Sequence, residues 1–160
     1  MDIYLIVLRL IHIIAAFLWV GTGFYTGFIL LPGLAQPGAD AAKIMGPLSK
    51  SRAFRLTFPV SAGITVLAGI LLYIKPGASS HFSNVGWGVL SIGALAGLAA
   101  VIHGGAVVGR MTTSYVTMLT SGSAQPADLA ATFAKLRQHV NISLVLLAIA
   151  VLGMEAARYL

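Results

Sequence analysis

Long, nearly uninterrupted runs of apolar residues alternate along the chain with shorter segments that hold most of its polar residues. A transmembrane helix needs about 20 mostly apolar residues to cross about 30 Å of hydrocarbon, and four runs reach that length. A closed transmembrane barrel would need strands of about ten residues with alternating polarity, which these runs lack. The pattern predicts an all-α, integral membrane four-helix bundle in a single domain, with spans at about 4–31, 56–74, 87–110 and 140–158.

The composition excludes several other classes of protein. Of the 160 residues, 58% are hydrophobic and 9% are charged, whereas a soluble domain carries roughly 25% charged residues. Disordered chains are polar and highly charged, so disorder is excluded as well. The absence of cysteine rules out disulfides, thiolate metal sites and iron–sulfur clusters. The sequence also has no paired carboxylates and no Ser/His/Asp set that would indicate a hydrolase.

The basic residues are distributed unevenly between the two sides of the predicted membrane. Loops rich in Lys and Arg stay in the cytoplasm, so loops 32–55 and 111–139 are predicted to be cytoplasmic. The chain is then a multi-pass protein of the cell membrane (an inner or plasma membrane), and both of its termini lie on the outer side of that membrane. The net charge of +6 reflects this topology and contact with anionic headgroups of the lipid bilayer, and not binding to nucleic acid. The basic residues of the cytoplasmic side are Lys43, Lys50, Arg52, Arg55, Arg110, Lys135 and Arg137, against Arg9, Lys75 and Arg158 on the other.

The two predicted loops differ in character. Residues 39–54 place Ile44, Met45 and Leu48 roughly on one face, which is typical of a helix lying along the membrane interface. Residues 111–120 contain no Gly or Pro, so the third span is expected to continue as a helix beyond the membrane. Residues 121–126 then form the turn that leads to the next helix.

Three pairs of glycines are spaced four residues apart within the first and third spans. Such spacing lets helices approach closely in a membrane, where lipid supplies no hydrophobic force between them, so the pairs predict a tight bundle or a dimer. The alternative is that glycine is simply common in membrane helices. The pairs are Gly23 with Gly27, Gly93 with Gly97, and Gly105 with Gly109.

Two histidines are placed symmetrically about the turn between the last two spans. The mean of positions 103 and 139 is 121, which falls on the turn itself, so His103 and His139 are expected at a similar height on neighbouring antiparallel helices. That placement suits a pair of ligands for a shared metal ion or haem iron, because the core of a helical bundle is a frequent cofactor site. The alternative is two unrelated interfacial histidines.

His12 lies on one face of the first span with Arg9, Ala16, Trp19 and Gly23. Small residues beside a histidine, with an arginine one turn away, are typical of a haem site. There the imidazole ligates iron and the arginine meets a propionate. The alternative is that His12 bonds a neighbouring helix and Arg9 extends to the headgroups. Counting residues from the outer surface puts His12 and His103 at different depths, so they belong to separate sites unless the helix ends are staggered.

Glu155 is the one acidic residue within a predicted span. Its depth matches that of Arg9, so an ion pair between the first and fourth spans is one interpretation. The other is a local pair with Arg158, three residues along the same helix.

The segment from Leu8 to Gly21 carries a family resemblance. It resembles the opening helix of the copper-resistance-D-like membrane domains and is similar to the first helix of the small four-helix protoporphyrinogen oxidases of the J type. The resemblance implies a four-helix bundle that binds haem b, with His12 as the first-helix histidine, His103 as a second functional position, and an oligomeric assembly. The oxidase group has a basic residue where its third helix begins, whereas 85–90 has none, so the resemblance favours haem binding over porphyrinogen oxidation.

Three functions are therefore compared. The first is a membrane cytochrome b, an electron carrier or oxidoreductase, with haem b on His12, His103 or His139, Arg9 and Trp19 beside it, and a quinone or another redox protein as partner. The second is a non-catalytic accessory subunit of a larger membrane complex. The third is a copper or other metal permease, which the lack of cysteine weakens because Cu(I) prefers soft sulfur ligands.

Overall fold

The computed structural model describes residues 3–34, 39–75 and 77–160, and within these ranges it contains helices and no strand. The all-α prediction is therefore confirmed. The π-helical segments η1 and η3 and the short 3₁₀ turns η2 and η4 connect or end the α-helices. In chain order the elements are α1 (Ile3–Tyr25), η1 (Thr26–Leu30), α2 (Leu31–Gly33), α3 (Ala39–Lys50), α4 (Arg52–Tyr73), η2 (Ala78–His81), α5 (Asn84–His103), η3 (Gly104–Gly109), α6 (Arg110–Ser121), α7 (Pro126–Ala156) and η4 (Ala157–Tyr159).

Four of the resulting rods are long and apolar enough to cross a membrane. They correspond to the four predicted spans. The second rod begins four residues before its apolar run and the last two extend further into the neighbouring polar sequence, whereas the first differs by one or two residues at each end. Large apolar side chains such as Phe17 and Leu152 are exposed along their lengths, which is the surface expected of helices that face lipid. The rods are Ile3–Gly33, Arg52–Tyr73, Asn84–Ser121 and Pro126–Tyr159.

Local chemistry explains where the rods begin and end. Ser51 and Ser83 have extended backbones, and their hydroxyls accept hydrogen bonds from the amides of Phe54 and Gly86, which starts α4 and α5 upstream of the apolar runs. Gly122 has a φ of 66° and ends α6. Pro126, in the first turn of α7, has no amide hydrogen to leave unpaired.

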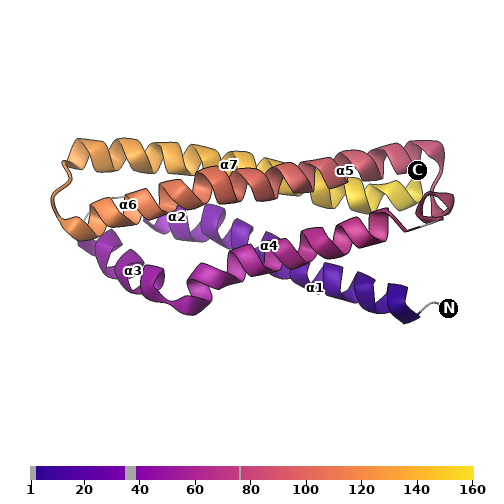
Figure 1. The fold of residues 1–160 in the computed structure, drawn as a ribbon. Coiled ribbons are helices and arrows are strands. Elements are labelled where there is room, and N and C mark those ends of the chain that lie inside the picture. Colours follow the sequence, from indigo (N-terminus) through magenta and orange to yellow (C-terminus); the bar gives the residue numbers. More distant parts are fainter. Residues whose placement is uncertain (1–2, 35–38, 76) are drawn as a thin grey trace.

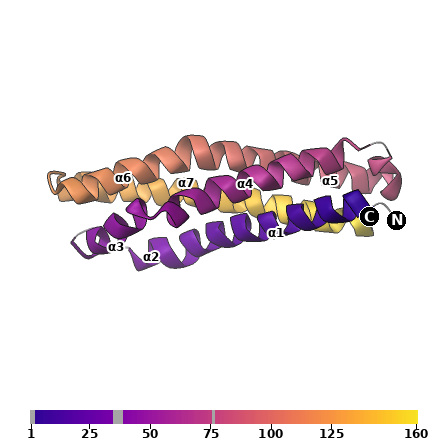
Figure 2. The same cartoon turned by 60° about the horizontal axis from the view of Figure 1, so that its bottom comes forward.

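The rods associate mainly as two antiparallel pairs, α1 with α4 and α5 with α7 (Figure 1). The start of α1, the connection from α4 to α5 and the C-terminus lie at one end of the molecule, here called the terminal end. Helix α3 and the turn from α6 to α7 lie at the other, the α3 end. A view rotated by 60° shows that the axes of all four rods are roughly aligned (Figure 2).

Glycines set the closest approaches between the rods. A methyl group added at Gly93 would lie 3.0 Å from the backbone nitrogen of Met154, so α5 and α7 pack backbone to backbone there. Gly23 and Gly27 receive Leu147 and Leu144 of α7. The pair Gly105 and Gly109, by contrast, lies in η3, where added methyl groups would meet no other helix. Two of the three pairs therefore lie where helices of this chain pack closely, as a tight bundle requires.

At the α3 end, the predicted loops form a packed helical layer. Helix α3 lies against α6, with Met45 buried and Leu48 partly buried, while Ile44 is exposed. Tyr115 and Leu136 complete this apolar cluster. Residues 111–121 thus continue the third rod, as predicted.

Candidate functional site

His103, His139 and Ser143 form a polar cluster between the second pair of rods. Nε2 of His103 lies 3.1 Å from Nδ1 of His139, and Nδ1 of His103 lies 2.9 Å from Oγ of Ser143. His103 is the last residue of α5, while His139 and Ser143 are one turn apart on α7. The contact confirms that the two histidines share one height.

The hydrogen bonds of this cluster limit what it can bind. A neutral imidazole has one N–H donor and one acceptor nitrogen. Both nitrogens of His103 take part in hydrogen bonds, so neither has a lone pair free for iron, whereas at His139 only Nδ1 takes part in one. The described residues include no group of three or more His, Cys, Asp or Glu side chains that could hold a metal ion.

His12 is held differently, between α1 and α4. Its Nδ1 lies 2.8 Å from the backbone oxygen of Thr65. A carbonyl oxygen only accepts, so Nδ1 carries the proton and Nε2 keeps its lone pair. Nε2 has no hydrogen-bond partner among the described residues. Gly69 makes room for the ring, because a methyl group there would lie 2.9 Å from Cε1 of His12.

His12 and His103 lie at different depths. Trp19 and Ala100 belong to one buried cluster, so they mark a common level on α1 and α5. His12 is seven residues before Trp19 and His103 is three residues after Ala100, and both helices run toward the α3 end (Figure 1). Ten residues of helix correspond to roughly 15 Å. The two histidines therefore cannot share one iron in this arrangement.

Of the other predicted site residues, Trp19 lies in the core and Arg9 lies at the surface. Trp19 is 3% exposed and packs edge-on against Phe58, with ring centroids 6.4 Å apart, and its Nε1 has no partner in the described chain. Arg9 is exposed on α1. Glu155 pairs locally with Arg158 at 3.1 Å, so the structure has the local alternative and not the link to Arg9.

Three contributors to these sites were not foreseen. Ser143 is four residues from His139 and so on the same face of α7, a spacing that could have indicated it. Gly69 was not predicted because nothing in the sequence distinguishes it from the many other glycines. The acceptor at Thr65 is a backbone atom, which no residue type identifies.

The fold thus defines an all-helical protein with four helices that are apolar enough to span a membrane. Comparisons with models of protein families, with curated proteins and with solved structures found no match. The resemblance carried by Leu8 to Gly21 therefore stays a prediction.

Proposed function

We propose that the chain is a multi-pass integral membrane protein of the cell membrane that binds haem b and transfers electrons, with both termini outside. Four long apolar helices support the membrane assignment. The excess of Lys and Arg near the α3 end supports a cytoplasmic location for that end.

The observation that carries the haem proposal is the hydrogen bond from His12 to Thr65. A metal-bound histidine almost always donates its other ring N–H to a carbonyl or carboxylate, which fixes the tautomer and the orientation of the ring. His12 already has this arrangement, because Nδ1 donates to the carbonyl and Nε2 has no partner within the described ranges. His12 therefore fits the role of axial ligand, whereas His103 does not.

The chain's own residues divide the work around a haem at His12. The Thr65 carbonyl orients the imidazole and raises its basicity. Trp19 and Phe58 fill the space between His12 and the α3 end of the molecule and keep water out. The exposed guanidinium of Arg9, one turn toward the terminal end, is available to a propionate. When bound, the haem supplies the one-electron chemistry.

A haem bound at His12 would be left uncovered on one side by a single chain. One surface groove lies on the Ile11, Ala15 and Leu18 side of α1, a smaller one lies along α7, and His12 lines neither of them. A second copy of the chain, or another subunit of a membrane complex, would supply the missing wall. We therefore infer an oligomeric cytochrome, whose redox partner would be a quinone or another protein.

The proposal is tested by visible spectra of the purified protein after haem supplementation, oxidised and reduced. We expect a haem spectrum in the wild type and in His103→Ala, and its loss in His12→Ala. A wild type that stays colourless would contradict the proposal and favour the non-catalytic accessory subunit.

One observation favours metal handling as a second function. The nitrogens of His103 and His139 are 3.1 Å apart, close enough to bind one ion if the hydrogen bond between them is replaced. A permease would take up metal in reconstituted vesicles, and His103→Ala would abolish that uptake. The proposal weakens if the uptake is unchanged in that variant.

A further inference from the structure

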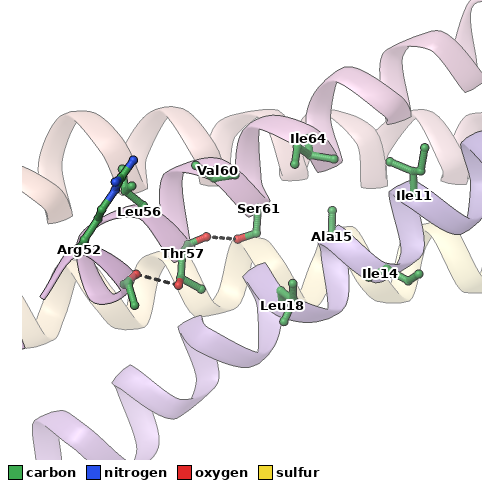
Figure 3. Close-up of a pocket in the computed structure, with 11 residues that line it drawn as sticks. Ile11, Ile14, Ala15, Leu18, Arg52, Leu56, Thr57, Val60, Ser61 and Ile64 are labelled. Atoms are coloured by element: carbon green, nitrogen blue, oxygen red, sulfur yellow. Dashed lines mark hydrogen bonds between the residues drawn. The ribbon is translucent and has the colours of Figure 1, made fainter.

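An apolar groove runs along the surface between α1 and α4 (Figure 3). Its volume is about 710 Å³, and its walls include Ile14 and Leu18 of α1 and Leu56, Val60 and Ile64 of α4. The two helices diverge beyond Leu18, which leaves the groove open toward the start of α4 (Figure 3).

The polar side chains along this groove are satisfied internally. The hydroxyl of Thr57 donates to the carbonyl of Ala53 at 2.7 Å, and that of Ser61 donates to the carbonyl of Thr57 at 2.6 Å (Figure 3). Neither hydroxyl has its proton free for a ligand. The groove therefore offers an apolar lining along most of its length, which suits a hydrocarbon chain.

A positive charge stands at one end of the groove. Arg52 lines the groove at the first residue of α4 (Figure 3). It is exposed and forms no ion pair within the described part of the chain, where Asp40 pairs with Lys43 and Glu155 pairs with Arg158. An arginine without a partner at the end of an apolar groove is complementary to an anion that carries a hydrocarbon chain.

The length of the groove matches one leaflet of a bilayer. Arg52 and Ile64 are twelve residues apart on α4, or roughly 18 Å along the helix. Half of the hydrocarbon core measures about 15 Å. An acyl chain that fills the groove would thus place its headgroup at the level of Arg52.

We propose that the groove between α1 and α4 binds one anionic phospholipid, with an acyl chain along Ile14, Leu18 and Val60 and the phosphate on the Arg52 guanidinium. Arginine binds phosphate through two parallel hydrogen bonds, which favours it over a diffuse surface charge. The inference needs α1 and α4 to face a bilayer, and it is independent of haem binding at His12.

Native mass spectrometry of the full-length protein in mild detergent tests the proposal. The protein is titrated with phosphatidylglycerol or with phosphatidylcholine of the same acyl chains. We expect one lipid to bind with about fivefold preference for phosphatidylglycerol, the effect of one basic residue at a membrane surface. Arg52→Gln should abolish that preference, whereas Arg55→Gln, next to the groove but not lining it, should retain it.

A second pair of variants tests the apolar wall. Ile13 and Ile14 are both 61% exposed, but only Ile14 lines the groove. Ile14→Trp should weaken binding of both lipids at least fivefold, and Ile13→Trp should leave it unchanged. Equal affinity for the two lipids, equal effects of Arg52→Gln and Arg55→Gln, or unaltered binding by Ile14→Trp would each overturn the proposal.

Discussion

The backbones of α5 and α7 meet at Gly93 and Gly153, where a methyl group at Gly153 would lie 2.9 Å from the Cα atom of Gly93. Helices α1 and α4 also touch, at His12 and Gly69, but they separate beyond Leu18 along an apolar groove. The two pairs of helices also differ in how many imidazole nitrogens of their histidines form hydrogen bonds. His103 uses both of its nitrogens within its pair of helices, and His12 uses one.

This difference indicates which pair is structural and which is available for binding. In α5 and α7 both nitrogens of His103 bond Ser143 and His139, so this network specifies how the two helices pack, although Nε2 of His139 has no hydrogen-bond partner among the described residues. In α1 and α4 a backbone carbonyl orients His12 and leaves Nε2 unpaired. Binding chemistry is therefore expected on α1 and α4, and substitutions in the two pairs should have different consequences.

The largest effect on stability is expected at Gly93. In Gly93→Ala the new methyl group meets backbone atoms of Met154, Ala150 and Gly153 at 3.0–3.2 Å, which cannot move aside without separating the helices. We expect a loss of about 2 kcal/mol in the free energy of unfolding, measured in detergent. Gly88→Ala, on the same helix with no atom within 4 Å, should cost nothing. Equal stability of the two variants would contradict the close packing of α5 and α7.

The corresponding change in the other pair is Gly69→Ala. Its methyl group would displace the His12 ring, because Cε1 lies 2.9 Å from that position. We expect at least a tenfold loss of haem affinity, measured by titration of the haem absorbance, with a smaller loss of stability than in Gly93→Ala. Gly63→Ala on the same helix meets no atom within 4 Å and is the matched control. Unchanged haem affinity in Gly69→Ala would argue against His12 as the ligand.

A smaller effect on stability is expected at Ser143. Ser143→Ala removes the partner of Nδ1 of His103, and leaving this polar atom of a partly buried side chain unpaired should cost about 1 kcal/mol. Ser61 is also buried, but its hydroxyl bonds the carbonyls of its own helix, so Ser61→Ala should cost less. Unfolding in detergent measures both variants. The structural role of the cluster fails if Ser61→Ala is the more destabilising.

The smallest effect is expected at Glu155. Its ion pair with Arg158 is exposed at both partners, and such pairs contribute about 0.5 kcal/mol or less. Glu155→Gln and Arg9→Gln should each lower stability by no more than that, and their effects should add. A double-mutant cycle that gave a coupling well above about 0.5 kcal/mol between Arg9 and Glu155 would restore the interhelical pair.

The sequence predicts the spans and the pairing of His103 with His139 because both depend on regular helical spacing. Apolar runs identify the rods, and equal distance from the turn at 121–126 sets the two histidines at one height. The rods are longer than the runs, since serine caps and the Gly122 turn determine the ends of the helices, whereas the runs reflect only hydropathy.

What the sequence cannot predict depends on rotation and divergence of the helices. The partner of His12 is a backbone oxygen of Thr65, and the groove arises because α4 leaves α1 beyond Leu18. Neither feature has a residue pattern. The Arg9 and Glu155 interpretation fails for a related reason, since matching depth does not bring two side chains onto facing surfaces and Arg158 is nearer along the chain.

If Nε2 of His12 is the ligand of haem iron, free imidazole should replace the missing side chain in a His12 variant. His12→Gly is purified with haem, with and without free imidazole, and the visible spectrum is recorded. We expect the haem spectrum of the wild type to be lost in the variant and to return when imidazole is added. A wild-type spectrum in His12→Gly without imidazole would contradict it.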